Sequence, residues 1–366
     1  MVSLSYHSPR RRPVHWVCLI ASALFLLACA GDETDTADLG SAGLTGDDGT
    51  QPDSSGPLCG GQVVPSGDYD LTFGGYSGDA GFKVQDWSVE EFNLISGASK
   101  TLFNLDNHAD GSINAFVVDD DDLYAVTNAE LYRFDRKLAQ LSLVSRAPDS
   151  SVDPSLGTTT FASHLSLSNT EVLTQPYYSE KMPSGDTQLD VYLGLFARPA
   201  GDLDLVPVNR RDFLSYAGDT FFFIQDVVDD NGLHYNEIDT YDPSSDSVAP
   251  LAARYVHYAF VGDTLWYTLR NGASSFDLYR VPVQGGTAEL VQNALTAGEF
   301  VTNGTQLYLM LEDPVTTGSI LTEFDLTSEA TRPLGGCSGL LVHASAGAVY
   351  VYQPTDTSTR AVRIPL

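Results

Sequence analysis

Basic residues are scarce in this chain. Only 19 of its 366 residues are Lys or Arg, against 48 Asp or Glu, which gives a formal net charge of −29. Nucleic acids and anionic bilayers bind proteins through clustered Lys and Arg, so this balance excludes both as direct partners. A self-repelling acidic surface is the ordinary interpretation, and a specific cationic partner is the alternative. Because Asp favours turns, the acid content also predicts many tight turns and few helices.

Long apolar runs are absent apart from residues 16–27, and that run is too short to span a bilayer. Three arginines at residues 10–12 precede it, which is the arrangement of an export signal. Residues 26–29 read Leu-Leu-Ala-Cys and resemble the lipobox of bacterial lipoproteins, which implies that Cys29 is lipidated. We therefore predict a lipid anchor in the outer membrane, facing the periplasm or the cell surface. The alternative is ordinary signal cleavage, which releases a secreted soluble protein beginning at Gly31.

Cysteine is rare as well, with only four residues. Cys18 is expected to leave with the signal, and Cys29 to carry the lipid. Cys59 and Cys337 lie at opposite ends of the remaining chain, and in an exported protein such a pair is most simply a disulfide. Two free thiols are the alternative. The chain has no C-x-x-C spacing, so thiol-redox and zinc–cysteine motifs have no support.

Composition divides the chain into three parts. Residues 1–28 form the predicted lipoprotein signal peptide. Residues 29–57 contain the lipidated cysteine and an acidic linker rich in Gly, Asp, Thr and Ser. That linker has too few large apolar side chains to bury a core, so we expect a disordered tether. Residues 58–366 form the predicted folded domain.

The folded domain has the pattern of an all-β protein. Short runs of Val, Tyr, Phe, Leu and Thr alternate with polar residues and are separated by turn residues, while helical periodicity is lacking. The runs recur about every forty to fifty residues, the length of a four-stranded propeller blade. An N-terminal copy brings the prediction to seven blades, with six as the alternative and a β-sandwich or solenoid as the competing fold. The other copies begin near Ile113, Ala162, Asp212, Tyr255, Gly298 and Cys337.

A family resemblance supports the propeller. Residues 277–290 read Asp-Leu-Tyr-Arg-Val-Pro-Val-Gln-Gly-Gly-Thr-Ala-Glu-Leu and resemble the outer hairpin of TolB-like and related bacterial β-propeller repeats. The resemblance spans residues from about 62 to 366 and implies a fold, not an activity. The last copy lacks its final strand, and an open ring would leave unpaired sheet edges. We expect residues 62–65 to supply this strand and a Cys59–Cys337 disulfide to lock the junction.

Two acidic segments contain carboxylates of the kind that bind calcium. Asp119 and Asp121 belong to the run 119–122, which we interpret as a turn between strands, because consecutive carboxylates point in different directions. Asp229 lies in a segment that resembles a calcium loop. With Gly232 at the invariant glycine of an EF-hand, however, apolar residues occupy the first and last ligand positions. We therefore predict no metal ion and no cofactor.

No catalytic residues can be assigned. The sequence has no Gly-x-Ser-x-Gly elbow, and its histidines lack metal-ligand spacing. We therefore predict a monomeric binding protein that presents propeller loops to an envelope or extracellular protein or glycan. The alternative is a hydrolase or lyase acting at the mouth of the central channel, and a passive acidic surface protein is a third hypothesis. The histidines that follow the signal are His108, His164, His234, His257 and His343.

Overall fold

Every regular element that the structure describes is a β-strand. The structure is a computed structural model, and the predictions for the signal peptide, Cys29 and the tether lie outside its described residues. The described residues are 59–64, 74–85, 87–106, 112–127, 130–146, 157–167, 171–181, 187–198, 203–208, 214–217, 220–229, 232, 234–313, 315, 318–354 and 359–366.

The strands form antiparallel meanders of four, which we number as blades in chain order. The first strand of each blade is innermost in the ring and the fourth is outermost. Blade 1 contains β2 (Gly75–Ser77), β3 (Ala80–Gln85), β4 (Ser88–Asn93) and β5 (Ser99–Asn104). Blade 2 contains β6 (Ala115–Val118), β7 (Asp122–Val126), β8 (Glu130–Asp135) and β9 (Gln140–Arg146). Blade 3 contains β10 (Gly157–Leu167), β11 (Glu171–Lys181), β12 (Thr187–Ala197) and β13 (Leu203–Val208).

The second half of the chain continues the same pattern. Blade 4 contains β14 (Leu214–Ala217), β15 (Thr220–Val228), β16 (His234–Asp242) and β17 (Ser247–Ala253). Blade 5 contains β18 (Tyr255–Val261), β19 (Thr264–Arg270), β20 (Phe276–Pro282) and β21 (Glu289–Leu295). Blade 6 contains β22 (Val301–Thr302), β23 (Gln306–Glu312), β24 (Ser319–Asp325) and β25 (Thr331–Gly336). Blade 7 contains β26 (Leu340–Ala344), β27 (Ala348–Pro354), β28 (Thr359–Pro365) and, from the other chain end, β1 (Gln62–Val63).

Blades 5 and 6 are joined into one eight-stranded sheet by a local contact. The end of β21 meets β23 at a single pair, Leu295 with Leu311, and the Thr296 N–H donates to Met310 O at 2.9 Å. The short β22 pairs with β23 only at Tyr308 and Leu307. The end of β21 pairs with the later part of β23, which β22 leaves free. The described strands therefore form six hydrogen-bonded sheets, and dividing the eight-stranded sheet at this contact gives the seven four-stranded blades of the sequence prediction.

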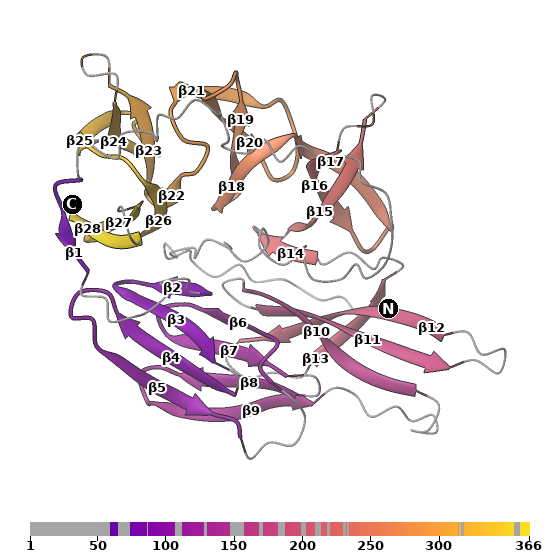
Figure 1. The fold of residues 1–366 in the computed structure, drawn as a ribbon. Helices are drawn as coiled ribbons and strands as arrows, with labels where there is room; N and C mark the ends of the chain where they lie inside the picture. The colour runs from indigo at the N-terminus through magenta and orange to yellow at the C-terminus, as the bar shows by residue number, and fades with distance from the viewer. Residues whose placement is uncertain are drawn as a thin grey trace, which may run out of the picture.

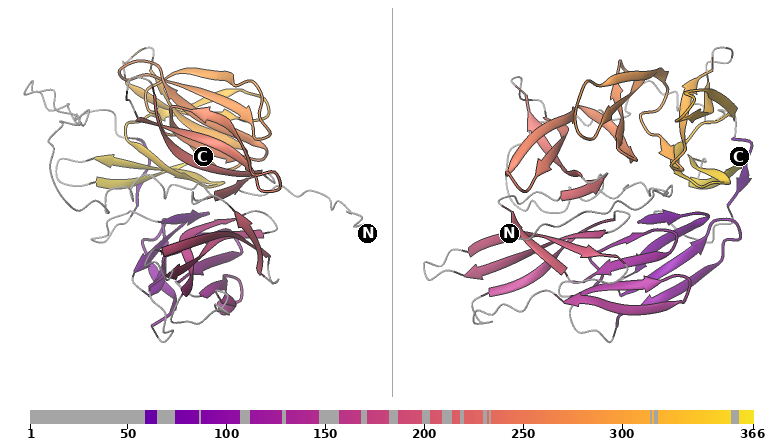
Figure 2. Two further views of the ribbon diagram at one scale, coloured as in Figure 1. Left: turned by 90° about the vertical axis from the view of Figure 1, so that its right-hand side faces the viewer. Right: turned by 180° about the vertical axis from the view of Figure 1, so that it is seen from behind.

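The blades close into a ring. Blades 1 to 3 lie below and blades 4 to 7 above in the view of Figure 1, and Figure 2 shows the same arrangement from the side and from behind. Buried apolar clusters join six of the seven successive pairs of blades, including blade 7 with blade 1, and β14 of blade 4 contacts β10 and β11 of blade 3. Burying both faces of every blade requires a closed ring, and the second strands β7 and β23 accordingly contain runs of consecutive buried residues.

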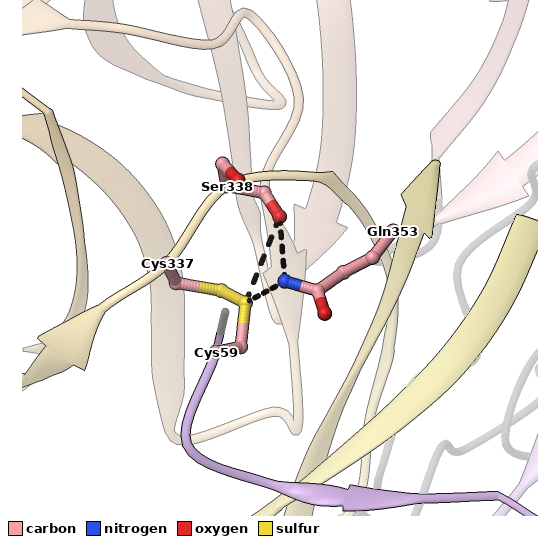
Figure 3. Close-up of a disulfide and its surroundings, with 4 residues drawn as sticks. All are labelled: Cys59, Cys337, Ser338 and Gln353. Atoms are coloured by element: carbon pink, nitrogen blue, oxygen red, sulfur yellow. Dashed lines mark hydrogen bonds between the residues drawn. A yellow bond between two sulfur atoms is a disulfide. The ribbon is translucent and has the colours of Figure 1, made fainter. Parts of the chain in front are cut away.

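The two chain ends meet in blade 7, as the missing strand predicted. Gln62 pairs with Arg363 and Val63 with Val362, which makes β1 the outermost strand of the blade. Cys59 and Cys337 form the expected disulfide (Figure 3). A sandwich or solenoid does not require such a junction, and the all-β propeller prediction is confirmed.

Acidic and amide side chains shape the turns of the ring. In four blades, the turn between the third and fourth strands begins with Asn or Asp, whose Oδ1 accepts backbone N–H groups two or three residues ahead. The fifth residue of each turn has a positive φ, and it is glycine in only one of the four. The high Asp content is thus partly a consequence of repeated tight turns. The four turns begin at Asn93, Asp135, Asp242 and Asp325.

Candidate functional site

The Asp119–Asp122 run is the turn between β6 and β7. Asp119 Oδ1 accepts the backbone N–H groups of Asp121 and Asp122 at 2.9 and 2.7 Å. Asp120 accepts a hydrogen bond from Ser77 Oγ at 2.8 Å, and Asp121 pairs with Lys137 at 2.5 Å. Consecutive carboxylates therefore point to different partners instead of converging on one point.

Arginines use the same run to bind three blades together. Arg198, at the end of β12 in blade 3, contacts both Asp119 and Asp122 of blade 2. Arg136 of blade 2 donates to Ser77 Oγ of blade 1 at 2.8 Å and lies over a phenylalanine ring of that blade. Burial lowers the pKa of the Arg198 guanidinium. The charge of Asp119 and the hydrogen bonds of Arg198 with Tyr124 and Asp119 raise it by more, so the net pKa lies above the ordinary value for arginine. The guanidinium groups occupy the carboxylates that a cation would need, so this cluster is an inter-blade junction.

Asp229, the other metal candidate, lies elsewhere in the ring. It follows β15 in blade 4 and accepts a hydrogen bond from Arg254 at 2.8 Å, and Arg254 in turn lies over Tyr235. The structure does not bring it together with Asp119 or Asp121, which belong to blade 2. Within the described residues, no group of three or more His, Cys, Asp or Glu side chains is arranged to hold a metal ion.

The described histidines are separate from one another. His343 stacks between Tyr76 and Tyr350 where blade 7 meets blade 1, and burial lowers its pKa to about 4. His257 is half-buried and packs edge-on against Phe300 where blade 5 meets blade 6, and desolvation lowers its pKa as well. His234 is exposed beside Asp226. His108 and the side chain of His164 lie outside the described part of the chain. The three described histidines are thus packed or solvated singly.

The two faces of the ring are distinguished by their connections. In each antiparallel meander, the turn between the second and third strands lies at the same end as the connection to the next blade. We call this end the connection face. The opposite end, with the turns between the first and second and the third and fourth strands, is the turn face. The long hairpins β11–β12 and β15–β16 therefore turn on the connection face, and blade 3 extends well beyond its neighbours in Figure 1.

Four exposed apolar side chains lie on the connection face, one in each of blades 4 to 7. Val228 ends β15 and is 53% exposed, and Val315 lies in the turn between β23 and β24 and is 85% exposed. Val256 and Leu340 lie at the starts of β18 and β26 and are 42% and 47% exposed. One of these side chains therefore comes from each of four consecutive blades. The turn face carries the exposed side chains of Ile95, Leu138 and Leu366 in blades 1, 2 and 7. It also carries Val248 and Leu290 at the starts of β17 and β21 in blades 4 and 5, which are 38% and 49% exposed.

The turn face carries a groove of about 430 Å³ between blades 4 and 5. Its size falls within the range of small-molecule sites. Its hydrogen-bonding groups are largely used within the protein, because Tyr241 donates to Asp246 at 2.9 Å and Thr240 donates to Ala249 O at 3.1 Å. The groove is open and its wall includes one carboxylate, from Asp242. We regard it as subsidiary to the connection face.

Sequence reasoning missed the connection face for a physical reason. Val315 lies in a turn and Val256 in a strand, and only the ring places these two valines on the same face. The repeated Asn or Asp at the third turn of a blade was a readable signal. It recurs at Asp135, Asp242 and Asp325 with the same spacing to a residue of positive φ.

No protein-family model matches the sequence, and a search of curated proteins gives no match either. Solved structures with a similar arrangement include TolB from Acinetobacter baumannii (13% identity, TM-score 0.35), where the match covers 71% of this chain and 65% of that one. They also include an acylaminoacyl peptidase from Pyrococcus horikoshii (9% identity, TM-score 0.46), covering 78% of this chain and 51% of the peptidase.

A third similar structure is the β-propeller domain of the Trilobed protease from Pyrococcus furiosus, at 8% identity and a TM-score of 0.46. The match covers 80% of this chain and 96% of that domain. This chain thus spans less than two thirds of the TolB and acylaminoacyl peptidase chains. At these identities and scores we draw no functional argument from the similarities, and the propeller assignment rests on this chain's own sheets.

Proposed function

We propose that this protein is an extracytoplasmic binding protein that is held to the membrane by a lipid on Cys29 and that binds a protein or glycan partner with its connection face. The observation that carries the proposal is the exposed apolar set Val228, Val256, Val315 and Leu340 on that face. These four side chains come from adjacent blades on one side of the ring, and apolar side chains that are exposed together can mark an interaction site. The rigid ring would hold the four blades in fixed relative positions, which lowers the entropy cost of binding.

The charged groups support a binding role in a different way. Asp119, Asp122 and Arg198 form contacts within the ring, as do Asp229 and Arg254. These groups stabilise blades and junctions instead of converging on a substrate. A hydrolase or lyase needs convergent acid, base or nucleophilic groups, and no described cluster supplies that arrangement.

The anchoring part of the proposal rests on the sequence of residues 10–29. A lipid attached to Cys29 would leave the ring at the end of a tether of about thirty residues, whose flexible span is roughly 30 Å. Within the described residues there is no helix long and apolar enough to cross a membrane. Replacing Cys29 with Ser should move the protein from the membrane fraction to the soluble fraction.

Site-specific photocrosslinking tests the binding face. A photoreactive residue is placed at Val315, and a matched control at Leu138, which is also highly exposed but lies on the turn face. Both sites lie in turns, so neither change should disturb the core. Irradiation of cells that produce the anchored protein should give one adduct of constant mass from position 315 only. Equal labelling from both positions, or from position 138 alone, would refute the proposed face.

A further inference from the structure

The strand that closes the ring is held by few contacts of its own. β1 has only two residues, paired with Arg363 and Val362, and the next residue, Val64, donates its N–H to Ala361 O at 2.9 Å. Val63 is half exposed at the outer edge of blade 7. Each backbone hydrogen bond contributes about 1 kcal/mol net. A pull applied directly to β1 would therefore act on a weak attachment.

Along the chain, the disulfide at Cys59 comes before β1, so it separates β1 from the N-terminal segment. Cys59 comes three residues before β1, and its side chain is buried with Cys337 in the cluster between blades 6 and 7. Cys337 lies in the connection from β25 to β26, and its N–H donates to Ser319 O at 2.9 Å. Gln353 donates to Cys59 Sγ at 2.9 Å and to Ser338 O at 3.0 Å (Figure 3). The disulfide is thus attached to the buried core between blades 6 and 7.

We propose that the Cys59–Cys337 disulfide is the mechanical attachment point of the N-terminal segment and that it keeps tension away from β1. Tension arriving from residue 58 passes through the two sulfur atoms to Cys337 and enters the fold at blades 6 and 7, so it bypasses β1. In this respect the inference rests on the proposed function, because an anchored tether opposing a bound partner is the source of the tension. The disulfide then has a role beyond its contribution to equilibrium stability.

Without the bond, the same tension would reach β1 first. Detaching β1 would expose the outer edge of β28, and unpaired sheet edges promote aggregation. It would also pull on Val64, which packs in the cluster between blades 7 and 1 with Tyr76 and Phe92. The predicted failure therefore begins at the closure of the ring.

Single-molecule stretching of the full chain between its two ends tests this load path. With the disulfide intact, only the segment after Cys337, residues 338–366, can be extended from the fold, which releases about 100 Å at roughly 3.5 Å per residue. In the Cys59→Ser/Cys337→Ser variant, all residues after Cys59 can be extended, which releases about 1,070 Å. The extension thus changes about tenfold.

The order of events is the decisive measurement. In the double variant, and in the wild type after reduction, we expect a first step at low force of about 56 Å as residues 59–74 detach ahead of blade 1. The oxidised wild type should lack this step. An early step of about 56 Å in the oxidised protein would overturn the proposal, as would the absence of this step from both the variant and the reduced wild type.

Two features keep this test separate from the proposed function. Circular dichroism before stretching checks that the variant is folded, and the reduced wild type provides a second route if it is not. The experiment uses neither membrane nor partner, so its outcome does not depend on lipidation or binding. Conversely, loss of membrane attachment or of the crosslink would leave the measured load path unchanged.

Discussion

Lowering the pH from 7 to 5 is expected to weaken the junction between blades 7 and 1 through His343. Its ring lies 4.8 Å from the ring of Tyr76 and 5.8 Å from that of Tyr350, measured between centroids. Its Nε2 lies 2.9 Å from Gly78 O, a contact that an N–H at this atom satisfies. Burial lowers the pKa of His343 to about 4, with Gly78 and the nearby Asp79 carboxylate opposing the shift.

The sign and size follow from proton linkage. The unfolded chain has the ordinary histidine pKa of 6.5, so below that pH it binds more protons than the folded chain does. The stability that neutral His343 contributes is therefore lost as the pH falls from about 6.5 towards 4. A folded pKa near 4 gives a loss of about 2 kcal/mol between pH 7 and pH 5 from this group alone.

Denaturant unfolding at both pH values, with wild type and His343→Gln, measures this loss. Glutamine can still donate to Gly78 O but does not titrate, so the difference between pH 7 and pH 5 should shrink by about 1–2 kcal/mol. Asp and Glu residues elsewhere titrate equally in both proteins and cancel. Leu138→Ala changes an exposed, non-titrating side chain away from this junction and should retain the wild-type difference. An unchanged difference in His343→Gln would refute the reasoning.

Three stability measurements test other parts of the ring. Replacing Cys59 and Cys337 with Ser should lower the free energy of unfolding by about 2–5 kcal/mol, and an unaltered midpoint in denaturant would contradict the closure. Asp119→Ala removes a turn cap and an inter-blade ion pair and should cost about 1–3 kcal/mol, whereas Asp119→Asn should cost less because it keeps the cap. Leu307→Ala in the core should lower the free energy of unfolding by about 2–5 kcal/mol, and Leu138→Ala on the surface by under about 0.5 kcal/mol. Equal shifts of the two melting temperatures would contradict the assignment of Leu307 to the core.

The closure of the ring could be predicted because its signals are present in the sequence itself. The last repeat lacks one strand, residues 62–65 offer a short β-like run, and the two cysteines lie at opposite ends of the domain. The repeat beginning near Tyr255 also matches β18 to the residue. Strand alternation and turn residues act over short distances, so a single sequence reveals them.

The junctions between blades could not be predicted in this way. Arg198 binds Asp119 across 79 residues, and nothing in the sequence pairs one arginine with one of four neighbouring carboxylates. The contact of Leu295 with Leu311 likewise depends on how short β22 turns out to be. The same holds for His343, whose burial depends on Tyr76 from the opposite end of the domain. Such features follow from tertiary packing, which local patterns do not encode.

Peptide mapping of the protein isolated from its own membranes, digested without a reductant, tests the central claim most directly. The claim is that the chain is an anchored ring whose N-terminal end is locked to blade 7. We expect one disulfide-linked peptide pair that contains Cys59 and Cys337, and an N-terminal peptide that begins at acylated Cys29. Alkylation of both Cys59 and Cys337 before reduction would contradict the closure. An unmodified N-terminus at Gly31 would contradict the anchor.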